Sequence, residues 1–287
     1  MKFHQQFFPV EKMCRIFKIS PSAYYYWKQN NVSNRKNMDQ ELLRNIKEVY
    51  RSSHKTYGSP RIYHELKKQD ICVSRTKVAR LMSKNNIRSV HAKKFKITTN
   101  SKHNYPVFEN ILDRNFTMER EGKAWVSDIT YINTKEGWLY LTIVLDLYDR
   151  KAIGWALSSR MFANETVIPA FKMACLNRPI VDDLIFHSDR GVQYAGNEFK
   201  KQLENPLITQ SMSRKGNCWD NAVAESFFKS LKKECVYRNN YLTRNEAELS
   251  VFQWIEMWYN TNRIHSSLGN KSIKEFVKSN KNQILAA

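Results

Sequence analysis

Three segments between residues 125 and 158 constrain the fold most. Segment 125–134 alternates in polarity and is rich in β-branched and aromatic residues. The turn Lys135-Glu136-Gly137 separates it from a second strand-like segment, 138–147, and another short polar turn leads to a third, 152–158. Strands joined by tight turns predict an antiparallel meander.

Helical and strand-like patterns alternate after this meander. Helices are expected over 164–176, 196–203, 219–236 and 246–266, and strands over 184–187 and 208–212. Strands followed by alternating helices and strands predict a mixed-sheet α/β domain. We expect this domain to cover residues 120–287.

The first 35 residues predict two short helices separated by a turn. Ser20 is expected to cap the second helix, with Pro21 at its first position. Helix, short turn and helix are the outline of a helix-turn-helix, a DNA-binding motif. An ordinary helical hairpin fits this segment equally well.

Residues 36–90 predict a second all-α unit, after a polar linker over 30–36. One helix passes through Leu42 and Tyr50, and two more cover 62–68 and 74–85. Basic side chains lie in a turn and on the polar side of the last helix, which makes this unit a second candidate for DNA binding. The candidate DNA-contacting residues here are Arg61, Arg75, Lys77 and Arg80.

Positive charge is concentrated in the first part of the chain, whose net charge is +20. Residues 1–120 hold 25 lysines and arginines against 9 acids, and residues 121–287 hold 22 against 18. A basic half attracts a polyanion through phosphate contacts and counterion release. We interpret it as nucleic-acid binding. A solubilising surface, or attraction to RNA or anionic lipid, is the alternative.

Residues 91–119 are expected to form a basic linker between the helical units and the α/β domain. An extended chain of this composition suits contacts along DNA phosphates, with Lys93, Lys94 and Lys96 as candidates. A disordered tether is the alternative interpretation.

Neither a membrane segment nor a disulfide framework is expected. The most apolar stretch, Trp138–Leu145, is far shorter than the roughly 20 residues of a membrane helix. The N-terminal residues contain no apolar segment of signal-peptide length. The five cysteines are scattered and form no CxxC pair. We expect a cytoplasmic protein.

Three acids occupy unusual positions. Asp128 lies inside a strand, where aspartate is unfavourable by propensity. Asp189 follows a short apolar strand, where α/β sheets tend to place functional groups, and Gly191 permits a tight turn beyond it. Glu225 lies on the polar stripe of a helix. Each has an ordinary alternative: an edge salt bridge for Asp128, a polar residue that closes a strand for Asp189, and a surface Glu–Lys pair for Glu225.

Taken together, the three acids indicate a metal site. Hard divalent cations prefer carboxylate oxygens, and two of them about 3.5–4 Å apart can promote in-line phosphoryl transfer. Without metal, clustered carboxylates repel one another, so at least one pKa should rise. Lys229 and Lys232 follow Glu225 on the same stripe and are expected to grip a phosphate backbone.

The acids stand in motifs of a known family. Trp125-Val-Ser-Asp128-Ile-Thr-Tyr131 and Ser188-Asp-Arg-Gly-Val-Gln-Tyr194, with 35 residues between Asp189 and Glu225, resemble the Asp-Asp-35-Glu core of retroviral integrases and bacterial transposases. Segment 211–234 resembles transposases of the insertion-sequence-three family.

Other segments fit the same family, so the resemblance covers nearly the whole chain. They are 13–25, 57–62 and 259–269. The departures are small: Val192 stands where the family often has serine, and Ser59-Pro60 replaces another pair. Neither touches the three acids.

The resemblance implies an RNase H-like catalytic domain in which Asp128, Asp189 and Glu225 bind two Mg²⁺ ions, with Mn²⁺ as a substitute. In the reaction that the resemblance implies, water attacks a phosphodiester at the end of the insertion sequence, and the liberated 3′-OH attacks a second strand. Additional DNA-contacting candidates are Arg190, Arg214 and Lys215. Additional candidates for lining the site are His187, Asn217, Asn221, Arg263 and His265, although a buried structural histidine is an alternative for His187.

The resemblance also implies partners. These are double-stranded DNA, as terminal repeats and as target, and at least one further copy of the chain, because two DNA ends must meet. An upstream-frame segment with a helix-turn-helix and a coiled coil would be added by ribosomal frameshifting; no leucine heptad is visible in this sequence. A circular intermediate and a nucleoid-associated location in bacteria are further implications.

Two other functions fit parts of the sequence. A nuclease of the same fold would cut DNA without joining it. A non-catalytic DNA-binding regulator would use the acid cluster only for structure.

Overall fold

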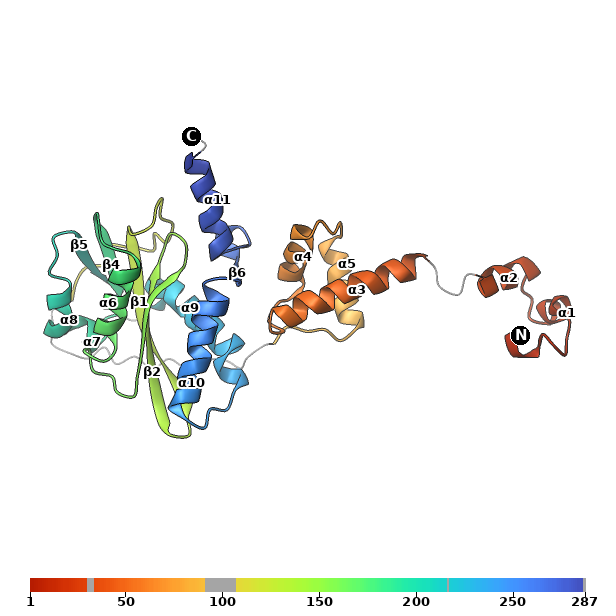
Figure 1. The fold of residues 1–287 in the computed structure, drawn as a ribbon, viewed down its shortest axis with the longest axis horizontal. Coiled ribbons are helices and arrows are strands. Elements are labelled where there is room, and N and C mark those ends of the chain that lie inside the picture. The colour runs from red at the N-terminus through yellow and green to blue at the C-terminus, as the bar shows by residue number, and fades with distance from the viewer. Residues whose placement is uncertain (30–33, 91–106, 216, 286–287) are drawn as a thin grey trace. The chain divides into compact units, whose positions relative to one another are not determined.

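The computed structural model describes the chain except for residues 30–33, 91–106, 216 and 286–287 (Figure 1). The chain divides into two compact units, Met1–Arg88 and Ser89–Ala287. Lys93, Lys94 and Lys96 therefore lie outside the described residues.

The first unit is all-α. Its helices are a 3-10 helix (Lys2–His4), α1 (Val10–Ile16), α2 (Pro21–Gln29), α3 (Asn34–Ser52), α4 (Ser59–Lys68) and α5 (Arg75–Lys84). The expected cap at Ser20 forms, because Ser20 Oγ accepts from the Ala23 N–H. Ser74 Oγ caps α5 in the same way by accepting from the Lys77 N–H. The predicted linker was too long, since α3 already begins at Asn34.

A small core holds α3, α4 and α5 together. Ile46, Ile62, Leu66 and Val78 are fully buried and come from all three helices. The helical periodicity therefore predicted this part of the unit correctly.

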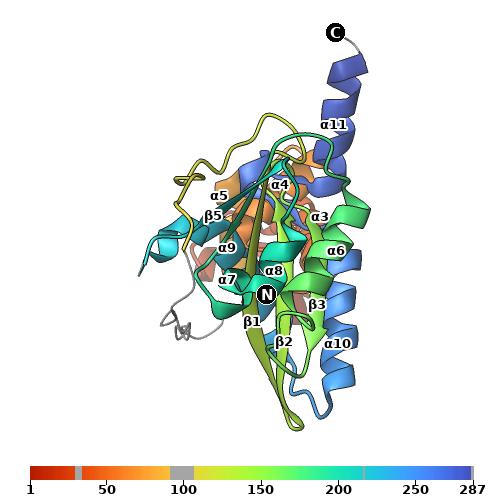
Figure 2. The same cartoon turned by 90° about the vertical axis from the view of Figure 1, so that its left-hand side faces the viewer.

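The second unit contains a five-stranded mixed sheet, as predicted. Its strands are β1 (Ala124–Thr134), β2 (Gly137–Asp146), β3 (Ala152–Ser158), β4 (Leu184–Ser188) and β5 (Ile208–Met212), in the order β3-β2-β1-β4-β5. β1, β2 and β3 form the antiparallel meander, whereas β4 runs parallel to both β1 and β5. Figure 2 shows the long β1–β2 hairpin extending beyond the shorter strands.

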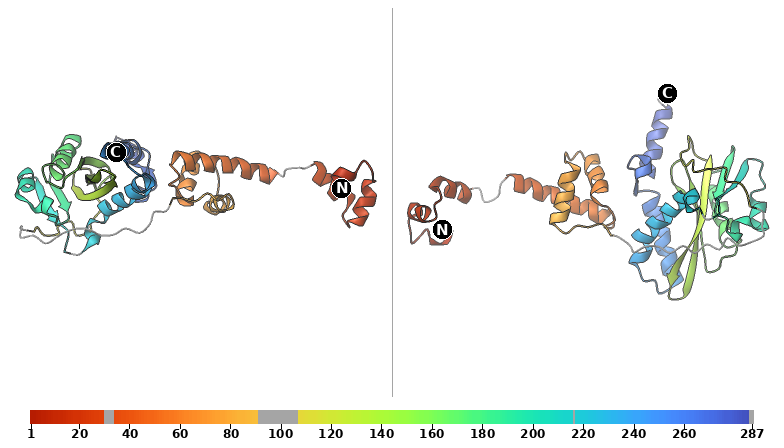
Figure 3. Two further views of the ribbon diagram at one scale, coloured as in Figure 1. Left: turned by 90° about the horizontal axis from the view of Figure 1, so that it is seen from below. Right: turned by 180° about the vertical axis from the view of Figure 1, so that it is seen from behind.

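Helices cover both faces of this sheet (Figure 3). On one face lie α6 (Val167–Asn177), α7 (Val192–Ala195) and α8 (Asn197–Gln202); on the other lie α9 (Ala222–Glu234) and α10 (Arg244–Phe252). The core on the first face includes the buried rings of Trp125, Phe171, Phe186 and Phe199. Because side chains alternate along a strand, Trp125 faces this core and Asp128 faces the side of α9.

The C-terminal part differs from the sequence prediction. The helix expected over 219–236 is a 3-10 turn (Cys218–Asn221), then α9, then a second 3-10 turn (Val236–Arg238). The long helix expected over 246–266 is α10 followed by a π-helix (Gln253–Tyr259). It stops there because the Asn260 side chain bonds both the N–H and the C=O of Ala152 on β3, at 3.0 Å each.

Smaller elements were missed or misplaced. The helix expected from Asn164 begins at Val167, and α7 is too short to show periodicity. The remaining elements are β6 (Ile264–His265), a 3-10 turn (Ser266–Leu268), β7 (Lys271–Ser272) and α11 (Ile273–Leu285). None of the helices in the described residues is long and apolar enough to cross a membrane.

Gly154 on β3 packs closely against α6. A Cβ at this position would lie 2.1 Å from the Ala170 carbonyl oxygen and 2.8 Å from Ala174 Cβ. Gly154→Ala should therefore push α6 off the sheet and destabilise the domain by about 3 kcal/mol or more. Urea denaturation measures this. Ala156→Gly on the same strand is the comparison, and equal stability of Gly154→Ala and wild type would contradict the packing argument.

Candidate functional site

Asp128 and Asp189 lie at the same level of neighbouring parallel strands. Val126 of β1 pairs with His187 of β4, and each acid comes two residues after its member of this pair. Asp128 is in the middle of β1, and Asp189 directly follows β4. Glu225 lies in the first turn of α9, which packs against β1.

The charges of Asp189 and Glu225 both act on Asp128. Burial raises the pKa of Asp128 well above its ordinary value, and the charges of Asp189 and then Glu225 raise it further. Partial burial also raises the pKa of Glu225. Among the described residues, however, no three His, Cys, Asp or Glu side chains converge closely enough to hold a metal ion. The carboxylates thus interact through their charges without meeting at one point.

Gly191 is required by close approach to Asp189. The Gly191 N–H donates to Asp189 Oδ1 at 2.9 Å, and a Cβ on Gly191 would lie 3.0 Å from that oxygen. The Gly191 φ of −63° is ordinary for any residue. Glycine is therefore favoured by the lack of room for a Cβ beside Asp189 and not by the backbone conformation of the turn.

Gly191→Ala should therefore displace the Asp189 carboxylate by a few tenths of an ångström, and the DNA strand transfer that the resemblance implies should fall about 10-fold, with unchanged thermal stability. Rates on labelled DNA ends measure this. Val192→Ala is the matched control, because Val192 is the next residue and its side chain is exposed. A wild-type rate for Gly191→Ala would refute the positioning argument.

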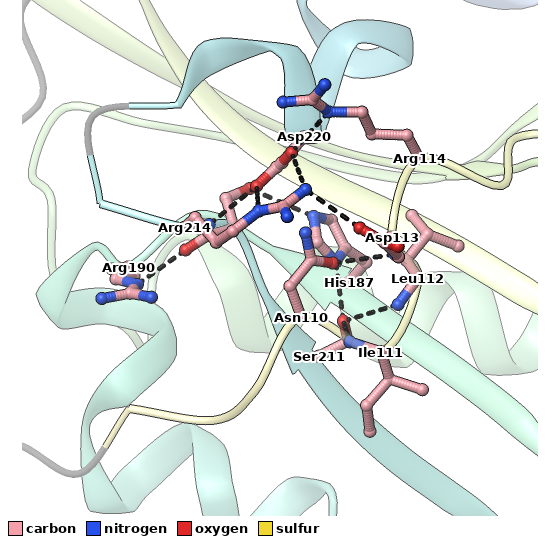
Figure 4. Close-up of polar contacts among 11 residues, drawn as sticks. Asn110, Ile111, Leu112, Asp113, Arg114, His187, Arg190, Ser211, Arg214 and Asp220 are labelled. Carbon is pink, nitrogen blue, oxygen red and sulfur yellow. Dashed lines mark hydrogen bonds and ion pairs between the residues drawn. The ribbon is translucent and has the colours of Figure 1, made fainter.

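Asp220 fixes the loop between β5 and α9 (Figure 4). This fully buried carboxylate accepts hydrogen bonds from the Arg214 backbone N–H, from Arg214 Nε and from Arg114 Nε, each at 2.9 Å. Hydrogen bonds from Arg214 and Arg114 hold the pKa of Asp220 well below its ordinary value. Arg214 also pairs with Asp113 at 3.0 Å.

His187 is a buried link between strands. Its Nδ1 lies 2.9 Å from Ser211 Oγ, and its Nε2 lies 3.1 Å from Ser213 Oγ. Ser211 Oγ already accepts from the N–H groups of Ile111 and Leu112, so its hydroxyl proton goes to Nδ1. Burial lowers the pKa of His187 to about 4, in agreement with a neutral ring. The structural interpretation of His187 fits these contacts.

The candidate DNA-contacting lysines differ in exposure. Lys215 and Lys229 are exposed, whereas Lys232 is only 5% exposed. The Lys232 Nζ lies 5.6 Å from the Tyr131 ring centroid, and burial lowers its pKa to about 8 while the charge of Asp128 opposes this. One lysine of the polar stripe of α9, Lys232, is therefore buried against β1.

The candidate arginines are mostly engaged within the protein. Arg190 Nε donates to the Ser213 carbonyl at 2.6 Å. Arg61 lies over the Tyr57 ring. Lys77 and Arg80 both pair with Asp39 of α3, at 2.9 and 3.5 Å, and Arg75 is exposed.

The remaining site-lining candidates divide into two groups. Asn221 is near the acids, because its Nδ2 donates to the carbonyl of Ser127, next to Asp128. Asn217 precedes the same 3-10 turn. By contrast, the buried Arg263 pairs with Glu234 at the far end of α9, and His265 packs against Tyr259.

Asp220, Arg114 and Ser211 were not singled out from the sequence. Asp220 stands inside a motif shared with the resembling family, which was the available signal. Its partner Arg114 is 106 residues away in the chain, so no local pattern could reveal the contact.

The fold and the site together define a class. A mixed sheet in the order β3-β2-β1-β4-β5, with acids on two adjacent strands and on a helix that packs on them, is an RNase H-like integrase catalytic core. Family models agree: an integrase core domain matches residues 118–218, a second integrase core model matches 207–272, and an HTH-like domain matches 38–95.

Two similar proteins show to which family within this class the chain belongs. A 31 kDa protein of insertion element IS600 from Shigella sonnei is 40% identical over 264 residues, covering 92% of this chain and 97% of the relative. Transposase InsF for insertion sequence IS3A from Escherichia coli K12 is 36% identical over 279 residues, covering 96% of each. The chain belongs to this family of insertion-sequence transposases. It is a polynucleotidyl transferase of the DDE class, with a helix-turn-helix-like DNA-binding region.

Solved structures similar to this chain are viral integrases. A simian T-cell lymphotropic virus intasome in complex with PP2A regulatory subunit B56 gamma has a TM-score of 0.47 at 15% identity, covering 80% of this chain and 73% of that one. The HTLV-2 integrase catalytic core in complex with magnesium has a TM-score of 0.40 at 16% identity, covering 54% and 95%.

Proposed function

We propose that Asp128, Asp189 and Glu225 are the catalytic residues with which this transposase cleaves DNA at the ends of its insertion sequence. The liberated 3′-OH then attacks a second strand. The observation that carries the assignment is the adjacency of the elements that hold the three acids, β1 beside β4 and α9 packed on β1, with the charges of Asp189 and Glu225 both raising the pKa of Asp128. No side chain has to form a covalent bond to DNA in this scheme.

The three carboxylates fit divalent metal ions by their chemistry. Their oxygens are the ligands that hard cations prefer, and a cation would relieve the repulsion that raises the pKa of Asp128. We assign them two Mg²⁺ ions, replaceable by Mn²⁺, which when bound would activate the attacking oxygen and stabilise the leaving one. β1 and β4 are neighbouring strands and α9 packs against β1, so the elements that carry the three acids are adjacent.

The surrounding residues have separate roles in this proposal. Lys229 is exposed one turn after Glu225 and contacts the DNA backbone. The buried Lys232 acts through the positive charge that it places beside Asp128. The Gly191 N–H holds the Asp189 carboxylate, and Asn221 holds the start of α9 against β1.

The proposed substrates are double-stranded terminal repeats and target DNA. Two DNA ends must come together, so the active form contains at least two copies of the chain. An upstream-frame segment that carries a helix-turn-helix and a coiled coil is a further proposed partner. The site of action is the nucleoid in the bacterial cytoplasm.

A strand-transfer assay on labelled element-end DNA with Mg²⁺ tests the function. We expect cleaved ends and joined products, both of which disappear when the metal is chelated. Cleaved ends without joined products would instead identify a nuclease. Protection of DNA from footprinting reagents without any metal-dependent cleavage would identify a regulator.

A further inference from the structure

Trp219 is the most exposed of the seven tryptophans, at 69%. It stands in the 3-10 turn Cys218–Asn221, directly before α9. Leaving an indole ring in water forgoes a large hydrophobic stabilisation. Whether the ring can fold back onto the protein depends on how firmly the backbone of this turn is held.

The two residues after Trp219 are both anchored. The buried Asp220 carboxylate is held by Arg214 and Arg114 (Figure 4). Asn221 is 5% exposed, and its side chain donates to the Ser127 carbonyl at 3.1 Å. These contacts fix the backbone immediately after Trp219 while the ring itself remains in solvent.

The same anchors place Trp219 beside the candidate acids. Asn221 bonds the residue before Asp128 on β1. Arg214, which holds Asp220, directly follows Ser213, and Ser213 Oγ lies 3.1 Å from Nε2 of His187, two residues before Asp189 on β4. Glu225 follows one helical turn after Asn221. The exposed ring is therefore next to a segment that contacts the strands of both aspartates and begins the helix of the glutamate.

We propose that Trp219 stacks on an unpaired nucleobase next to the phosphodiester that the three acids address. Every base has a flat π-face, so an exposed indole can bind one without reading its identity. The stack would hold the strand end open and keep its phosphate at the carboxylates. This inference rests on the proposed function and adds a base-binding subsite to it.

Fluorescence tests the stack without any cleavage. The full chain is bound to element-end duplexes without divalent cations, with 2-aminopurine at successive positions near the end. At one position we expect a change in 2-aminopurine emission that Trp219→Ala abolishes and Trp219→Phe partly retains. Trp138→Ala is the matched control, because Trp138 is 51% exposed on the β1–β2 hairpin and packs on Tyr131.

Binding energies give a second readout. Trp219→Ala should weaken binding of the end duplex about 10-fold. The loss should vanish on a duplex that lacks the base at the position found by fluorescence, because nothing then remains for the ring to contact. Circular dichroism and thermal melting verify that the variant folds.

Two results would overturn the stacking role. One is an unchanged 2-aminopurine signal in Trp219→Ala at every position. The other is a change in oligomeric state without any base-dependent signal, which would assign the ring to contacts between copies. A stacking signal without strand transfer in wild type would refute the proposed function alone. Normal strand transfer in wild type without any Trp219-dependent 2-aminopurine signal would refute the stack alone.

Discussion

Glu225→Gln should reduce DNA cleavage and strand transfer at least about a thousandfold. Glutamine keeps the size of the side chain but removes the anionic oxygens that the proposed metal ions need. The fold should be preserved, since the substitution also removes a charge that raises the pKa of Asp128. Initial rates on labelled element ends, measured in Mg²⁺ and again in Mn²⁺, give the magnitude.

Glu198→Gln is the control for this experiment. Glu198 is an exposed acid on α8 and is not one of the three proposed catalytic acids. Its replacement should leave the rate unchanged. DNA binding by Glu225→Gln should remain close to wild type. Full activity of Glu225→Gln would remove the assignment of all three acids, because they are proposed to act as one unit.

Asp220→Asn should lower both stability and activity. The amide loses the charge that accepts hydrogen bonds from Arg214 and Arg114, and one buried polar group is left poorly satisfied. We expect a loss of about 1–3 kcal/mol in the free energy of unfolding. Strand transfer should fall about 10-fold or more, since the turn before α9 is no longer fixed. Urea denaturation and rate measurements are made on the same preparation.

The pH dependence of this effect has a defined sign. The folded state lowers the pKa of Asp220, so the ionised group stabilises the fold above the ordinary aspartate pKa of about 3.9. This contribution is lost as the pH falls below that value toward the folded pKa. The stability difference between wild type and Asp220→Asn should thus be constant near neutral pH and narrow below about pH 4. A constant difference down to pH 3 would contradict the charge-based account.

The sheet was predictable because its signals are local. Alternating polarity and short turns located the meander, and the bounds of β3 and β5 agree with the prediction. The end of the π-helix at Tyr259 was not predictable, because it depends on Asn260 bonding to Ala152 on a distant strand. Tertiary hydrogen bonds overrode a continuous helical pattern there.

The site shows the same division. Asp128 and Asp189 became candidates because aspartate is unfavourable inside a strand and because α/β sheets tend to place functional groups directly after their strands. Burial of Lys232 was not predictable from the polar stripe of α9, because the stripe does not reveal that Tyr131 of β1 lies under its far end. The exposure of each basic side chain depends on partners from other helices and strands, which the local sequence does not show.

Residues 109–114 join the first part of the chain to the catalytic sheet. The Met212 N–H donates to the Glu109 carbonyl, and Ser211 and Asp220 bind the residues that follow. Phe108, just before this segment, lies under Lys200 of α8, so residues 108–114 contact α8, β5 and the turn before α9. A displacement of this segment would therefore act directly on the turn that precedes Glu225.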